Sequence, residues 1–108
     1  MSDDVLERLA GVIRDRRTAA ADKSYTRQLL DGGVGKCARK LGEEAVETII
    51  AATSQSDDEL TSEAADLLYH LLVVLESREI ALSDVLKILE GRMGVSGFEE
   101  KASRAESG

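Results

Sequence analysis

The sequence contains no proline and no tryptophan, and it has only one phenylalanine and two tyrosines among its 108 residues. It also lacks long runs in which β-branched and polar residues alternate, the pattern expected of half-buried strands. Alanine, leucine and glutamate are abundant instead, and all three have high helix propensity. The composition therefore predicts an all-α protein.

Cysteine is equally scarce, because Cys37 is the only one in the sequence. A single thiol excludes an intrachain disulfide and a zinc site built from several cysteines. The first four residues also lack the basic and then apolar character of a secretory signal, and no apolar run is long enough to cross a membrane. We therefore expect a cytoplasmic protein with no membrane partner.

Positive charge is in deficit, with 14 Lys and Arg against 21 Asp and Glu and a formal net charge of -7. This balance argues against a general nucleic-acid binder, which would carry a basic excess. A hydrophobic content of 43% is too high for a disordered chain, and the length allows one core. We expect a single domain over residues 1–94 and a mobile C-terminal tail over residues 95–108.

Apolar residues recur at helical spacing in five segments, which predicts a bundle of four to five helices. The expected helices are residues 4–17 behind Ser2 or Asp3, a short helix from Ser24 or Thr26 to about Asp31, residues 36–53, residues 57–77 behind a capping box of Ser56 and Glu59, and a last helix from Ser83 or Asp84 to Arg92-Met93-Gly94.

The glycine-rich residues 32–36 superficially resemble a phosphate-binding loop. No strand precedes them and no Gly-Lys-Ser/Thr follows at the required spacing, so that reading fails. They predict a helix stop and a turn. A further use stays open, in which flexible backbone brings Lys36 beside a metal-bound phosphate.

The segment 60–75 is apolar over roughly 220° of a helical wheel. A helix of this kind is packed on more than one side, either in a bundle core or at a subunit interface. A chain this short offers few helices to cover it, so we expect a homodimer that completes the bundle.

Five carboxylates form two clusters on the helices 36–53 and 57–77. Glu43, Glu44 and Glu47 share one helical face by their i, i+3 and i, i+4 spacing, and Glu63 and Asp66 share another. If the two helices pack side by side, the carboxylates converge and repel one another unless a hard cation binds, usually Mg²⁺. Taken alone, the first cluster also fits a solvated face. The second edges a widely apolar helix, where unpaired charge is costly, and this favours a site.

His70 lies one helical turn beyond Asp66 on the same strip of the helix. Two interpretations stay open for this side chain. It is either a hydrogen-bonded structural group or a second-shell or substrate contact of the acidic site.

The acidic pattern and several other stretches together resemble a known enzyme family. Glu43-Glu44-x-x-Glu47, followed after fifteen residues by Glu63-x-x-Asp66, resembles the signature of the MazG-like superfamily of all-α nucleotide pyrophosphohydrolases. Within it, the chain is similar to the phosphoribosyl-ATP pyrophosphohydrolases over about residues 5–104. The stretches that carry this similarity are Ser24-Tyr25-Thr26, Lys40-Leu41-Gly42-Glu43-Glu44-Ala45-Val46-Glu47, Glu63-Ala64-Ala65-Asp66-Leu67-Leu68-Tyr69-His70 and Arg92-Met93-Gly94-Val95-Ser96-Gly97.

The resemblance implies an all-helical, usually dimeric enzyme that uses Mg²⁺ and no other cofactor. It implies hydrolysis of phosphoribosyl-ATP to phosphoribosyl-AMP and pyrophosphate, the second step of histidine biosynthesis. It also implies a stand-alone enzyme, since the cyclohydrolase domain of bifunctional relatives is missing. The residues that match the family's metal-ligand positions are Glu44, Glu47, Glu63 and Asp66, with Glu43 as an extra carboxylate; the candidates for substrate phosphate are Lys40 first and then Lys36, Arg27 and Arg92.

Hard-metal chemistry gives the expected mechanism, in which a bound cation neutralises phosphate charge and activates a water. Glu44 or Glu47 would accept the proton of that water. Two alternatives remain at this stage. One is a housecleaning pyrophosphatase of the same superfamily that acts on nucleoside or deoxynucleoside triphosphates, and the other is a non-enzymatic helical dimerisation or adaptor module with solvated acidic strips.

Overall fold

The computed structural model describes residues 4–20 and 24–94, and within these ranges it contains helices and no strand. The elements are α1 (Asp4–Asp15), the short 3-10 helix η1 (Arg16–Thr18), α2 (Tyr25–Asp31), α3 (Gly33–Ser54), α4 (Asp57–Ser77) and α5 (Leu82–Met93). This confirms the predicted all-α class. The expected caps Ser2 and Asp3 and the tail 95–108 lie outside the described residues.

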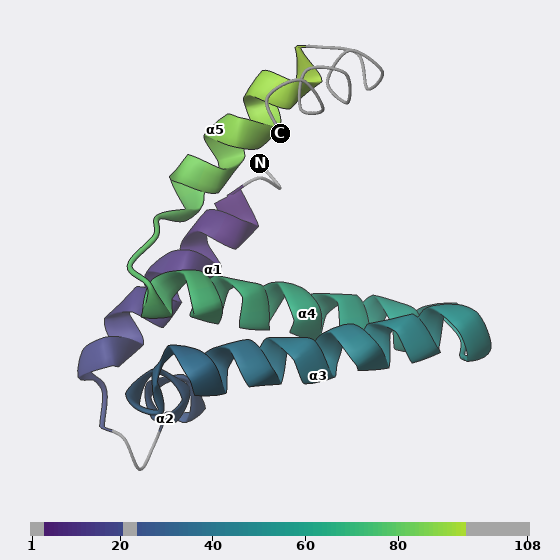
Figure 1. Ribbon diagram of the computed structural model, residues 1–108, viewed down its shortest axis with the longest axis horizontal. Coiled ribbons are helices and arrows are strands. Elements are labelled where there is room, and N and C mark those ends of the chain that lie inside the picture. Colours follow the sequence, from purple (N-terminus) through teal and green to yellow (C-terminus); the bar gives the residue numbers. More distant parts are fainter. Residues whose placement is uncertain (1–3, 21–23, 95–108) are drawn as a thin grey trace.

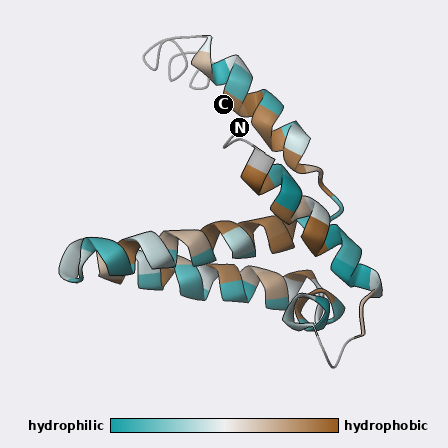
Figure 2. Ribbon diagram, turned by 180° about the vertical axis from the view of Figure 1, so that it is seen from behind, coloured by the Kyte–Doolittle hydropathy of each residue, from teal (hydrophilic) through white to brown (hydrophobic). Residues whose placement is uncertain are grey.

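The two long helices α3 and α4 form an antiparallel hairpin, and the other helices gather at one end of it (Figure 1). α2 lies across the start of α3, α1 packs against α4, and α5 extends along α1 away from the hairpin. Buried side chains from α1 to α4 meet at this end: Ile13, Leu29, Cys37, Leu72 and Val73. Figure 2 shows the matching gradient, with hydrophobic residues on the half of α4 that meets α1 and hydrophilic residues at the hairpin turn. Among the described helices, none has the length and apolarity needed to cross a membrane.

Two helices, α4 and α2, begin behind the capping residues that the sequence predicts. Ser56 Oγ accepts a hydrogen bond from the Glu59 N–H at 3.1 Å, and Glu59 Oε1 accepts one from the Ser56 N–H at 3.4 Å. This capping box starts α4 at Asp57 as expected. Ser24 likewise caps α2 by accepting the Arg27 N–H at 3.1 Å.

Three predicted boundaries differ from the structure. α1 gives way to η1 after Asp15 instead of continuing to residue 17. The glycine-rich stretch stops α2 with a turn at Gly32 as predicted, but α3 begins at Gly33, whose φ is +88°, and not at residue 36. α5 starts at Leu82 behind an extended Ala81 and has no side-chain cap, so the predicted caps Ser83 and Asp84 lie in its first turn.

The face of α3 that meets α4 is built from small residues. Cys37 and Ala51 are buried, and the Thr48 hydroxyl donates to the Glu44 carbonyl at 2.7 Å and to the Glu63 carbonyl of α4 at 3.3 Å. The larger apolar side chains Val46 and Ile49 lie on the opposite side and are 55% and 62% exposed. Small residues therefore let the two backbones approach, and the apolar face is left uncovered within one protomer.

α4 ends in a Schellman motif whose left-handed residue is not glycine. The Glu79 N–H donates to the Glu76 carbonyl at 2.9 Å, and the Ile80 N–H donates to the Leu75 carbonyl at 2.9 Å. Glu79 has a φ of +56°, and among the described residues it is the one non-glycine residue with positive φ. A side chain in this conformation costs stability that glycine would not.

We predict that Glu79→Gly raises the free energy of unfolding by about 1 kcal/mol, because it relieves the left-handed conformation. Thermal unfolding at a fixed protein concentration measures the change. Arg78→Gly is the matched control, since Arg78 has a φ of -99° and gains nothing from glycine. A melting temperature that falls for both variants would contradict the prediction.

Candidate metal centre

The antiparallel packing of α3 on α4 brings Glu44, Glu63 and Asp66 together. One carboxylate oxygen from each lies within 4.8 Å of the others, so the three can bind a single ion. The Thr48 hydroxyl fixes the register at this point, because it bridges the carbonyls of Glu44 and Glu63 across the two helices. Of the five carboxylates predicted to converge, these three do so in the structure.

Partial burial makes this cluster electrostatically unfavourable when it is fully charged. Burial raises the pKa of Glu44, and the negative charges of Glu47 and Asp66 raise it further. Burial is also the main cause that raises the pKa of Glu63, followed by the charges of Glu47, Glu44 and Asp66. Glu63 Oε1 is buried and has no hydrogen-bond partner among the described residues. An all-oxygen set with an unsatisfied buried acceptor fits a hard divalent cation such as Mg²⁺.

The other two carboxylates occupy different positions. Glu47 is exposed and lies outside the group of three, but its charge acts on both Glu44 and Glu63. Glu43 accepts a hydrogen bond from Lys40 Nζ at 3.0 Å, and this contact lowers the pKa of Glu43 and raises that of Lys40. Lys40 also lowers the pKa of Glu44 through its charge. Lys40 thus stands beside the cluster, and Glu43 holds it there.

The remaining cationic candidates are not gathered around the cluster within this protomer. Arg27 Nε donates to both carboxylate oxygens of Asp31 at 3.0 Å, and a second guanidinium nitrogen donates to the Ala19 carbonyl. Arg92 lies in the last turn of α5, which points away from the hairpin (Figure 1). Lys36 lies in the first turns of α3, where its side chain folds over Gly32.

His70 is buried between two tyrosines and next to the site. Its ring packs edge to face against Tyr69 at 4.9 Å and Tyr25 at 6.3 Å between ring centroids. Burial lowers the pKa of His70, and the charge of Lys40 lowers it further. The side chain is 6% exposed, and Nδ1 has no hydrogen-bond partner among the described residues. Sequence reasoning assigns no role to Tyr25 or Tyr69, although both lie in stretches that carry the family resemblance.

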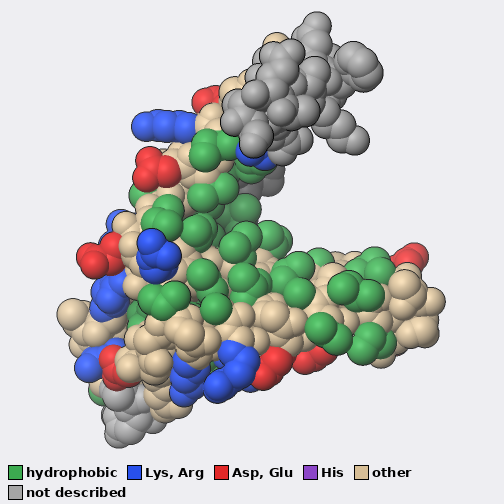
Figure 3. Space-filling view, in the orientation of Figure 1, with side chains coloured by type: hydrophobic (Ala, Val, Ile, Leu, Met, Phe, Trp, Pro, Cys, Tyr) green, Lys and Arg blue, Asp and Glu red, His purple; other side chains and the backbone are tan. Residues whose placement is uncertain are grey.

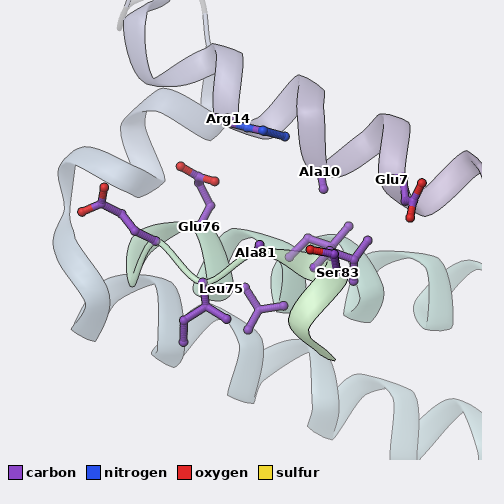
Figure 4. A pocket seen from close by; sticks show the side chains of 11 residues that line it. Glu7, Ala10, Arg14, Leu75, Glu76, Ala81 and Ser83 are labelled. Atoms are coloured by element: carbon purple, nitrogen blue, oxygen red, sulfur yellow. The ribbon is translucent and has the colours of Figure 1, made fainter. Parts of the chain in front are cut away.

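A cavity of about 400 Å³ lies elsewhere, between α1 and the bend from α4 into α5 (Figure 4). Glu7, Ala10 and Arg14 of α1 face Leu75 and Ser83 across it. None of the predicted site residues lines this cavity. This cavity is therefore separate from the acidic cluster of Glu44, Glu63 and Asp66.

Comparison with known proteins agrees with the geometry. Residues 6–93 match the family model described as phosphoribosyl-ATP pyrophosphohydrolase. The chain is similar to curated proteins named phosphoribosyl-ATP pyrophosphatase. These include one from Dinoroseobacter shibae (56% identical, covering 93% of this chain and 98% of the relative), one from Nitrobacter winogradskyi (52%, covering 89% and 83%) and one from Erythrobacter litoralis (48%, covering 95% and 99%).

The raised pKa values predict how stability depends on pH and on Mg²⁺. A carboxyl with a higher pKa in the folded state binds more protons when folded, so the free energy of unfolding falls as pH rises above the ordinary carboxyl pKa. In EDTA, the raised pKa values of Glu44 and Glu63 should therefore make the melting temperature fall as pH rises from about 4.3, the ordinary pKa of a Glu carboxyl, toward neutral pH. Added Mg²⁺ should raise it more at the higher pH, because protons compete with the cation for these oxygens.

The double variant Glu44→Gln/Glu63→Gln is the control for this experiment. It retains His70, whose lowered pKa acts in the opposite direction by raising stability as pH rises toward its ordinary pKa. The difference between the native protein and the variant therefore isolates the two carboxyls. An identical pH dependence for both proteins, with the same Mg²⁺ effect, would refute the assignment.

Proposed function

The chain belongs to the phosphoribosyl-ATP pyrophosphohydrolase family, and we propose that it hydrolyses phosphoribosyl-ATP to phosphoribosyl-AMP and pyrophosphate, the second step of histidine biosynthesis. The observation that carries this proposal is the meeting of Glu44, Glu63 and Asp66 across the α3–α4 hairpin. A nucleotide with a chain of phosphates is the substrate class that such a cluster serves, because Mg²⁺ is commonly shared between carboxylates and phosphate oxygens.

We propose that Glu44, Glu63 and Asp66 hold the Mg²⁺ of the enzyme. When bound, the ion supplies positive charge to the phosphate oxygens and lowers the pKa of water. The buried Oε1 of Glu63 supports this assignment. It has no hydrogen-bond partner in the described part of the chain, and an unsatisfied buried acceptor is costly unless a ligand completes it.

Glu47 is the candidate general base, because it borders the cluster but remains outside the group of three. In the proposed reaction, Glu47 accepts a proton from water, and the water oxygen forms a bond to the phosphorus nearest the nucleoside. The bond between that phosphorus and the bridging oxygen breaks, and pyrophosphate leaves. Lys40, held by Glu43, contributes a charged donor for the phosphate oxygens.

We also propose that the enzyme is a homodimer that covers the exposed apolar face of the protomer. Val46, Ile49 and Ile50 of α3 are exposed together with Leu68 and Leu71 of α4. Figure 3 shows hydrophobic side chains gathered in the angle between α5 and the hairpin. An apolar surface of this extent on a short chain is typical of an interface between subunits.

Turnover measured with Mg²⁺ on phosphoribosyl-ATP and on a set of deoxynucleoside triphosphates tests the function. We expect phosphoribosyl-ATP to be the faster substrate and EDTA to abolish hydrolysis. Faster turnover of deoxynucleoside triphosphates would favour a housecleaning pyrophosphatase instead. No turnover of any nucleotide would favour an adaptor module.

In the same assay, Glu47→Gln should lower kcat by at least about 100-fold, because a positioned general base contributes this much or more. It should still gain thermal stability from Mg²⁺, since Glu44, Glu63 and Asp66 remain. Glu90→Gln on the exposed surface of α5 is the matched control and should leave kcat unchanged. Full activity in Glu47→Gln would remove this residue from the mechanism.

Ile49→Asp tests the dimer, because it places a charge on the exposed apolar face. Light scattering at low protein concentration should show a dimer for the native protein and a monomer for this variant. Gln55→Asp adds the same charge at the polar hairpin turn and should remain dimeric. A native protein that is monomeric at micromolar concentration would overturn the proposal.

A further inference from the structure

An aromatic group lies beside the acidic cluster, where α2 meets α4. Tyr69 is fixed in this group by a hydrogen bond between its hydroxyl and Thr26 Oγ1, which ties the first turn of α2 to α4. The rings of Tyr69 and Tyr25 both pack edge to face against His70. Tyr25 of α2 is therefore held against His70 of α4.

The Tyr25 side chain is less buried and makes fewer contacts than that of Tyr69. It is 52% exposed, and its hydroxyl makes no hydrogen bond within the described part of the chain. The N-cap of α2 is supplied by Ser24 and not by this residue. A half-exposed ring that is held in place but only partly packed is suited to stack on a flat ligand.

His70 supplies the second observation. Its side chain is more than nine-tenths buried, yet Nδ1 has no partner among the described residues. A buried polar atom in this state costs stability, so a ligand or an ordered water must complete it. His70 is one helical turn from Asp66, so its buried side chain lies on the same strip of α4 as that carboxylate, whose charge acts on it.

Lys40 connects the aromatic group with the acidic cluster. It is close enough for its charge to act on His70 on one side and on Glu44 on the other, and it also interacts with Tyr25. Figure 3 shows the same succession on the surface, with Lys and Arg side chains near the start of α3 and acidic side chains farther along the hairpin. A ligand whose phosphates lie at the cluster and at Lys40 therefore continues toward Tyr25.

Resting on the proposed function, we infer that Tyr25 and His70 form the subsite for the purine base of the nucleotide. The ring of Tyr25 stacks on the base, and His70 Nδ1 makes a hydrogen bond to it, directly or through one water. This arrangement separates two tasks within the site. The carboxylates and Lys40 bind the phosphates, which all nucleotides share, and the aromatic group binds the part that distinguishes a purine nucleotide from inorganic polyphosphate.

Binding of ATP and of inorganic triphosphate tests this inference, since the two ligands differ by the nucleoside. Calorimetry with Mg²⁺ on the full chain carrying Glu47→Gln measures binding without turnover. Adding Tyr25→Leu should weaken ATP binding about tenfold, because base–aromatic stacking is lost, and should leave triphosphate binding unchanged. Tyr25→Phe keeps the ring and should keep the ATP affinity.

His70→Phe tests the second residue with a ring of similar size. It should weaken ATP binding about fivefold to tenfold through the lost hydrogen bond, without weakening triphosphate binding and without lowering the melting temperature of the free protein. With phosphoribosyl-ATP as substrate, Tyr25→Leu should raise KM and leave kcat largely unchanged, because it removes binding that the ground and transition states share.

Equal losses for ATP and triphosphate in Tyr25→Leu, or an unchanged ATP affinity, would overturn the subsite. Its failure is distinguishable from failure of the proposed function. If the native protein does not hydrolyse phosphoribosyl-ATP, but Tyr25→Leu weakens ATP binding and not triphosphate binding, the subsite stands and the assigned reaction fails. If the native protein hydrolyses phosphoribosyl-ATP and Tyr25→Leu leaves KM unchanged, the reaction stands and the subsite is refuted.

Discussion

The close contact between α3 and α4 is the constraint on which the rest of the structure depends. Two helices that carry facing carboxylates repel each other, so something must hold their backbones together at the point of repulsion. Thr48 does so by bridging the carbonyls of Glu44 and Glu63, and the small buried residues Cys37 and Ala51 let the helices approach. The carboxylates of the two helices meet because the face of α3 with Cys37, Thr48 and Ala51 lies against α4. The face with Val46 and Ile49 does not.

The orientation of α3 also determines which of its side chains are exposed on the surface of the protomer. With the small and polar residues of α3 turned inward, Val46 and Ile49 are turned outward. The buried core gathers at the end of the hairpin where α1 and α2 pack, apart from Ala51 near the hairpin turn. A protein that uses its main helix contact for chemistry has less of that contact available for hydrophobic burial. The proposed dimer interface and the acidic site are two consequences of one orientation of α3.

Much of the fold and part of the site could be predicted because the signals are local. The capping box at Ser56 and the i, i+3 spacing of Glu63 and Asp66 depend on neighbouring residues, and the structure reproduces both. The separate placing of Glu43 and Glu47 could not be predicted, since both fall within the same arc of the helical wheel as Glu44. Their positions depend on the register between α3 and α4 and on the contact of Lys40 with Glu43.

Other features needed information that sequence spacing does not contain. The start of α5 follows from the way α4 ends, because the Schellman motif at Glu79 delivers an extended Ala81 two residues before the predicted cap. The meeting of Tyr25 with His70 depends on how α2 crosses α4, which joins residues far apart in the chain. Tyr25 could have been singled out only through the Ser24-Tyr25-Thr26 stretch, which carries no chemistry of its own.

The short turn between α3 and α4 has a consequence for how this enzyme assembles. Contacts across a helical hairpin join residues that are close in sequence, and closing such a loop costs less conformational entropy than bringing distant segments together. The capping box at Ser56 adds a local signal that starts α4 next to that loop. The clustered oxygens of Glu44, Glu63 and Asp66 therefore belong to the part of the chain that costs the least conformational entropy to order.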